Sequence, residues 1–172
     1  TQDPAEQPWN TGHFTYDGTT ITGFSEAGEA KLEADQNVRI PDLTPDGQYV
    51  TAIGASAFAT STMTTIKLPE TLQSIGSAAF RAAALTELVM PDSVTSVAAG
   101  AFTNCASLET LVLSKNLTTI EQSVFNTTAL KEVLIPDGVT SIGRMAFRNT
   151  PIEMLVIPDT VTEIGQQAFL AH

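Results

Sequence analysis

The residue types that most often carry catalysis are scarce in this sequence. Its two histidines are His13, near the N-terminus, and His172, the final residue. Ser-His-Asp or Cys-His catalysis needs a histidine held as a general base, and neither position offers a site that would hold one. The nineteen aspartates and glutamates would allow a carboxylate pair, and a hydrolase would be revealed by loss of activity on changing Asp92 or Asp137. We expect most of these acids to be solvated turn residues, and we expect no enzyme.

The pattern of possible ligands predicts neither a metal nor a cofactor. The single cysteine, Cys105, cannot form an internal disulfide or make a cysteine-based zinc site alone. Its place beside Ala106, just before an extended run, is typical of a small buried hydrophobe more than of a reactive thiol. Calcium requires roughly six to eight oxygen ligands in a shaped loop. One acid per repeat, in a row that Lys115 interrupts, does not supply them: Asp42, Glu70, Asp92, Asp137 and Asp159.

Composition and charge describe a folded chain that avoids nucleic acid. Of 172 residues, 42% are hydrophobic and 16% are charged, which excludes a disordered, charge-dominated chain. Eight lysines and arginines against nineteen acids give a formal charge of −11, so phosphate backbones and anionic membrane surfaces are poor partners. No apolar stretch approaches the ~20 residues that cross a bilayer, and the N-terminal residues lack a signal-peptide pattern. We expect any export signal to have been removed or left out.

The strongest signal is an internal repeat of about 22 residues. Six phenylalanines recur at spacings of 22, 22, 23, 22 and 22: Phe58, Phe80, Phe102, Phe125, Phe147 and Phe169. An aliphatic residue stands five positions before each of them: Ile53, Ile75, Val97, Ile120, Ile142 and Ile164. One such unit cannot bury its aliphatics alone, whereas stacked units place each one against its counterparts. The sequence therefore predicts a solenoid with a buried column of phenylalanines.

Each unit also contains an extended run with apolar residues at its first, fourth and sixth places. These runs are 63–68, 85–90, 108–113, 130–135 and 152–157, and 38–40 is a shortened first copy. A proline followed by an acid comes after most of them, and proline ends a strand because it cannot donate to the sheet. The runs predict a parallel sheet along one side of the solenoid. We expect the following Ile-Gly-x-x-Ala-Phe segment to form a short helical or 3-10 turn on the opposite side.

These features together resemble the BspA-like, Treponema pallidum-type leucine-rich repeat. The pattern L-x-x-L-x-(I/L/M)-P-(D/E)-x-(V/L)-x-x-I-G-x-x-A-F covers residues 37–172, and residues 14–24 are similar to the family's first segment. The resemblance implies an α/β leucine-rich-repeat solenoid, a place on the bacterial cell surface, and binding of host or neighbouring-cell components. Residues 114–124 depart from the pattern; a site is one interpretation of this departure, and drift tolerated at a surface turn is the one we favour. Ala98 and Glu121 occupy the glycine position, so we expect that position not to demand glycine.

The two ends of the chain differ from the repeats. We divide the chain into a capping segment, 1–36, and one continuous solenoid, 37–172; within the cap, residues 1–13 are expected to be a linker or lead-in. Asp17-Gly18 predicts a two-residue hairpin. Around it are the residues expected to cover the first unit: Trp9, Phe14, Tyr16, Ile21 and Phe24. The C-terminus stops inside a unit, so we expect a truncated chain whose last unit is open to end-to-end pairing with a second copy.

The outward residues of the extended runs form the predicted binding surface. The first, fourth and sixth places point inward, so the third and fifth face outward. The fifth-place row carries four aliphatic residues beside a mixed third-place row, and an exposed apolar patch can mark a protein interface. The preference of β-branched residues for strands is the competing explanation. The candidate ligand-binding residues are Lys67, Glu87, Val89, Thr110, Val112, Glu132, Leu134 and Val156.

The aromatic residues favour a protein as the partner. Apart from the phenylalanine column, every aromatic residue lies within the first 49 residues, so the predicted face has no platform for stacking a sugar or a base. We predict a non-catalytic bacterial module, extracellular or at the cell surface, that binds a host or neighbouring-cell protein through this face without entering a membrane. The alternative is a passive structural spacer within a larger surface protein.

Overall fold

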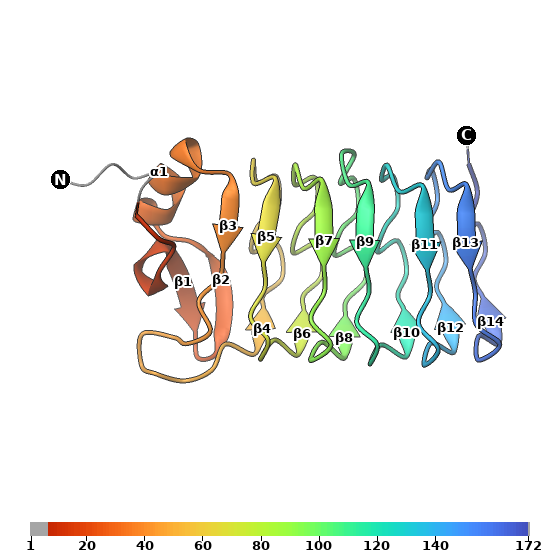
Figure 1. The fold of residues 1–172 in the computed structure, drawn as a ribbon, viewed down its shortest axis with the longest axis horizontal. Coiled ribbons are helices and arrows are strands. Elements are labelled where there is room, and N and C mark those ends of the chain that lie inside the picture. Colours follow the sequence, from red (N-terminus) through yellow and green to blue (C-terminus); the bar gives the residue numbers. More distant parts are fainter. Residues whose placement is uncertain (1–6, 172) are drawn as a thin grey trace.

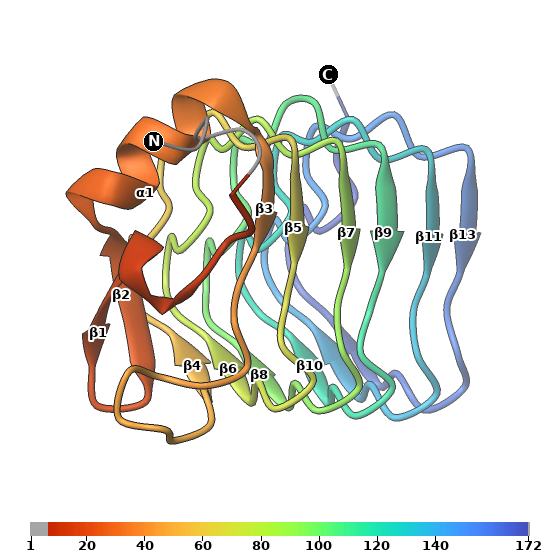
Figure 2. The ribbon, with the colours of Figure 1, turned by 60° about the vertical axis from the view of Figure 1, so that its left-hand side comes forward.

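A computed structural model describes residues 7–171, which wind into a solenoid with strands on two sides (Figures 1 and 2). The strands of the front side follow the predicted runs: β3 (Asn37–Arg39), β5 (Thr65–Lys67), β7 (Glu87–Val89), β9 (Thr110–Val112), β11 (Glu132–Leu134) and β13 (Met154–Val156). They pair in parallel as β3–β5, β7–β9 and β11–β13. Backbone bonds such as Thr86 N to Thr64 O, at 2.9 Å, connect one pair to the next. The predicted solenoid and its parallel sheet are therefore confirmed.

The opposite side is built from very short parallel strands. These are β4 (Ala52–Ile53), β6 (Ser74–Ile75), β8 (Ser96–Val97), β10 (Thr119–Ile120), β12 (Ser141–Ile142) and β14 (Glu163–Ile164). Their second residues are the aliphatics that precede each phenylalanine by five positions. Ile53, Ile75 and Ile142 are each 1% exposed, so this row belongs to the core as far as β12, whereas Ile164 of β14 is 53% exposed.

The helical or 3-10 turns predicted after these strands are wrong in detail. From residue 52 to residue 171 the described chain contains strands and turns but no helix. Two residues per turn adopt left-handed backbone, as Ala78 (φ 54°) and Ala82 (φ 55°) do in the second unit. Every other amide then reaches the next unit: Phe58 N donates to Ala79 O at 2.7 Å and Thr60 N to Arg81 O at 2.6 Å. A 3-10 helix would keep those amides for its own carbonyls.

The predicted column of phenylalanines runs through the interior. Neighbouring rings are stacked with centroids 5.0–5.5 Å apart from Phe58 to Phe169. Phe80, Phe102 and Phe147 are completely buried. Because every unit places its ring at the same height, one apolar core extends along the solenoid.

The glycines that follow β6 and β12 mark close approaches between neighbouring turns. A Cβ atom on Gly76 would lie 2.6 Å from Ala55 N, and one on Gly143 would lie 2.6 Å from Gln122 N. A side chain at either position would therefore force the backbone of the neighbouring turn to shift. The expectation that this position does not demand glycine is correct for Ala98 and Glu121 and wrong for Gly76 and Gly143.

The N-terminal end is closed by a hairpin and two helices. Strand β1 (Phe14–Asp17) pairs antiparallel with β2 (Thr20–Phe24), which confirms the hairpin. Asp17 pairs with Thr20, so the two loop residues are Gly18 and Thr19, one position later than predicted. Gly18 has φ 62°, which only glycine adopts at no steric cost. The Phe24 ring lies 4.8 Å from that of Phe58, so the predicted cap covers the first unit.

Two features of this end were not predicted. Helix α1 (Glu26–Ala34) begins at Ser25, whose Oγ accepts from Gly28 N, and it lies over the first turn of the solenoid (Figure 2). The 3-10 helix η1 (Thr11–His13) is ordered, so residues 7–13 are not a frayed lead-in. Trp9 donates from Nε1 to Asn37 O at 2.8 Å and ties this segment to β3. Residues 1–6 of the predicted lead-in lie outside the described residues.

Candidate binding surface

The exposed face of the front sheet alternates with the core residue by residue. In β7, Leu88 is fully buried while its neighbour Val89 is 60% exposed. The same alternation brings all of the predicted candidate residues to the surface on one side of the molecule, from Lys67 on β5 to Val156 on β13. Their accessibility follows from the two-residue period of a strand whose other face is buried.

The fifth-place row contains an aliphatic stripe, which we define as Val89, Val112, Leu134 and Val156. Val112 is 50% exposed, Leu134 55% and Val156 50%. Val89 stands directly beside Val112 in the strand register, and Leu134 beside Val156. Met154, 49% exposed and on the third-place row, widens the apolar surface at the end of the stripe. Met154 is the third residue of the run 152–157, an outward place, but it is not among the predicted candidates.

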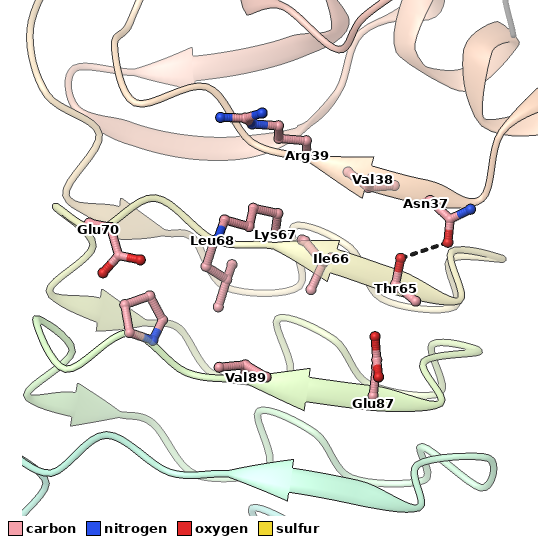
Figure 3. Close-up of a pocket in the computed structure, with 11 residues that line it drawn as sticks. Asn37, Val38, Arg39, Thr65, Ile66, Lys67, Leu68, Glu70, Glu87 and Val89 are labelled. Carbon is pink, nitrogen blue, oxygen red and sulfur yellow. Dashed lines mark hydrogen bonds between the residues drawn. The ribbon is translucent and has the colours of Figure 1, made fainter.

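The row continues beyond the stripe into a basic pair, which we define as Arg39 and Lys67. The two residues are partners in the β3–β5 register, two residues along from Asn37 and Thr65, whose side chains share a hydrogen bond of 2.8 Å. Figure 3 shows Arg39, Lys67 and Val89 in one row across three neighbouring strands. Arg39 was not among the candidates, because the first repeat is shortened and its distance to Lys67 is not 22 residues.

Shallow hollows lie along this row. One, of about 460 Å³, is lined by the basic pair and Val89, with Glu70 and Glu87 also at its wall. Another, of about 470 Å³, is lined by Val112 and Leu134 and by the turn that carries Asp137. Both are open to solvent, so the row offers a long, gently indented surface instead of an enclosed cavity.

Comparison with known proteins identifies the repeat. Residues 51–172 match the BspA type leucine-rich repeat region, in six copies. The chain belongs to this family. Proteins of this BspA-type family usually bind other proteins or are surface-associated, and the family is generally non-enzymatic. A comparison with curated proteins finds no match.

Solved structures of bacterial leucine-rich-repeat proteins share the fold. The Treponema pallidum leucine-rich repeat protein TpLRR superposes with a TM-score of 0.75 at 22% identity, over 92% of this chain and 86% of that one. A Bacteroides ovatus leucine-rich repeat protein superposes with a TM-score of 0.60 at 22% identity, over 88% of this chain and 52% of that one. The pneumococcal vaccine antigen PcpA superposes with a TM-score of 0.64 at 19% identity, over 85% of this chain and 47% of that one. The chain spans about half the length of the latter two.

Cys105 and His13 of this BspA-type protein are both packed in its interior. Cys105 is fully buried and its Sγ donates to Phe80 O at 3.0 Å. The burial confirms the prediction of a small buried hydrophobe, and it raises the pKa of the Cys105 thiol to about 11. His13 is buried and its Nδ1 accepts from Asn10 N at 3.0 Å. Burial, and secondly the charge of Lys31, lower the pKa of His13.

Metal binding and membrane spanning find no support in the described part of the chain. Within residues 7–171, no group of three or more His, Cys, Asp or Glu side chains is arranged to hold a metal ion. No helix among these residues is both long and apolar enough to cross a bilayer.

The divergent unit of the repeat has a structural role. Ser114, in the place of proline, is fully buried and donates from Oγ to Val94 O at 2.6 Å. Lys115 N donates to Asp92 Oδ1 at 3.0 Å, and Asn116 Nδ2 donates to Asp92 O at 2.6 Å. These three residues therefore bind the turn of the preceding unit.

Proposed function

We propose that this chain is a non-catalytic protein-binding module of the bacterial cell surface or of a secreted protein, and that it captures its partner with the exposed face of its front sheet. The partner is a host or neighbouring-cell protein. The candidate residues are those of the aliphatic stripe with Lys67, Glu87, Thr110 and Glu132, and Arg39 joins them. Binding requires no cofactor, because rigid display of side chains is sufficient.

The aliphatic stripe is the observation that carries this proposal. Four neighbouring strands each expose half or more of an aliphatic side chain at the same place. The front face also lacks the aromatic side chains on which glycans or bases stack, which favours a protein ligand. The sheet positions these residues rigidly, so little conformational entropy is lost when a partner binds.

A passive spacer is the second candidate, and the continuous core favours it. The column from Phe58 to Phe169 makes the solenoid one unbroken body, as a stalk requires. In a spacer, the exposed stripe would be only the consequence of strand propensity.

A substitution on the face separates the two functions. The double variant Val112→Lys with Leu134→Lys should abolish capture of a specific surface protein from host or neighbouring cells, measured by mass spectrometry after affinity capture. Ala99→Lys, at an exposed turn residue outside the front strands, is the matched control and should capture the same protein as the wild type. Equal capture by all three proteins would favour the spacer.

A further inference from the structure

Building on the proposed function, we propose that the partner docks an amphipathic α-helix along the fifth-place row. Acidic residues at one end of that helix lie over the basic pair, Arg39 and Lys67. Its apolar face lies along the aliphatic stripe. The inference rests on the proposed function and adds the chemical class and shape of the bound segment.

The charges at the β3–β5 end of the row point to an acidic ligand. Arg39 and Lys67 are register partners on adjacent strands, which lie about 4.8 Å apart. Like charges directly opposite one another destabilise a sheet. The ion pair found among residues 7–171 is Lys31 with Asp35, so no carboxylate of the described chain lies within ion-pair distance of either member.

The acids near the basic pair leave room for a ligand carboxylate. Glu70 lies in the turn after β5, and Glu87 is on the third-place row of β7. Figure 3 shows both carboxylates away from the row that joins Arg39, Lys67 and Val89. An acidic side chain placed over the row would relieve the repulsion between the two cations. A basic residue on the flank of the helix would find Glu87 or Glu132 on the third-place row.

The apolar part of the row requires a ligand that satisfies its own backbone. An extended segment laid across the face of a sheet would lose water from its N–H and C=O groups over the stripe and gain no partner there, because the strands use theirs within the sheet. Buried backbone groups without partners are costly. A helix forms these bonds internally and presents only side chains to the surface.

The spacing of the row also fits a helix better than a strand. The row advances by about 4.8 Å from one strand to the next. One turn of an α-helix advances about 5.4 Å, whereas alternate residues of an extended chain are about 6.6–6.8 Å apart. From β3 to β13 the row crosses five such intervals, about 24 Å, which corresponds to about 16 helical residues.

Synthetic peptides of about 16 residues test this arrangement. The probe has leucines on one face and two glutamates in its first turn, where they also stabilise the helix. A second peptide carries lysines in place of the glutamates, and a third has a proline in its middle. Binding is measured by fluorescence anisotropy to the wild type, to Arg39→Glu/Lys67→Glu and to Lys131→Glu. Lys131 is exposed on the segment before β11, away from the fifth-place row, and serves as the matched control.

We expect the glutamate peptide to bind the wild type and Lys131→Glu alike, and Arg39→Glu/Lys67→Glu at least tenfold more weakly. The lysine peptide should show the opposite preference, because the reversed charges are then complementary. Equal weakening by Lys131→Glu would overturn the inference, since it would indicate only general electrostatics. If the proline peptide binds the wild type as tightly as the glutamate peptide does, the proposal that the ligand is a helix would be overturned.

The outcomes also separate this inference from the proposed function. If no peptide binds while capture of a partner still depends on Val112 and Leu134, the face binds a protein by other means and the helix proposal alone fails. If anionic lipid vesicles bind and depend on the basic pair while the peptides do not, the ligand is a membrane surface and the inference is wrong.

Discussion

The ring of Phe102 lies on that of Phe80 with the two centroids 5.0 Å apart and the planes 3° from parallel. Both side chains are completely buried. Each unit therefore stabilises the next through the same contact, and a defect in one ring affects both neighbouring units.

Truncation in the middle of this column should be costly. We expect Phe102→Ala to lower the free energy of unfolding by about 3–5 kcal/mol, as core phenylalanine truncations do. Urea denaturation followed by circular dichroism measures the change. Phe169→Ala is the control, because Phe169 is only partly buried and has a stacked neighbour on one side. Phe169→Ala should lower the free energy of unfolding clearly less, and an unchanged unfolding midpoint in urea for Phe102→Ala would contradict the stacked core.

The close approach at Gly76 makes a second prediction. We expect Gly76→Ala to destabilise the protein by about 1–3 kcal/mol, the usual cost of overpacking, because the new methyl group meets Ala55 N at 2.6 Å. Gly47→Ala is the comparison: its added Cβ meets nothing within 4 Å, and any cost comes from its left-handed backbone, φ 80°. If Gly76→Ala unfolds at the same urea concentration as the wild type, adjacent turns are more loosely packed than described.

The N-terminal cap should respond to pH through His13. Burial lowers the pKa of His13 below its ordinary value near 6.5, so the unfolded chain binds a proton more readily than the folded one. The stabilising contribution of neutral His13 is therefore present above about pH 6.5 and is lost as the pH falls below that value. Protonation would also remove the Nδ1 acceptor that caps Asn10 N.

The control for this prediction is His13→Asn, which retains a side-chain acceptor but does not titrate in this range. Thermal unfolding of both proteins between pH 5 and 8 should show a steeper loss of stability on acidification for the wild type. Parallel curves would show that His13 does not couple to folding.

Cys105 should be inert in the native protein. Its thiol is fully buried with a pKa of about 11, so almost no thiolate is present at neutral pH. We expect alkylation by iodoacetamide at pH 7.5 to be very slow without denaturant and fast in 6 M urea. Rapid modification of the native chain would mean that the turn at 104–107 opens readily.

The periodicity of the sequence was enough to predict the core. Phe58 and Phe80 had to stack because a strict period of about 22 residues brings like residues to the same height in each turn. The exposure of Val89 and Val112 followed in the same way from the alternation of a strand whose other face is buried. Helix α1 escaped prediction because its buried residues, Gly28, Lys31 and Leu32, do not form an apolar stripe.

Two features depended on contacts that no local pattern contains. The turns after the back strands are not 3-10 helices because amides such as Phe58 N bond to carbonyls one whole unit away. The basic pair arises because β3 and β5 align Arg39 with Lys67 although 28 positions, not 22, separate them. The sequence by itself determined which recurring residues of the repeat, such as Phe80 and Leu88, are buried, because that depends on period. Only the tertiary structure decided which charges face each other, because register between turns depends on the length and path of the intervening loop.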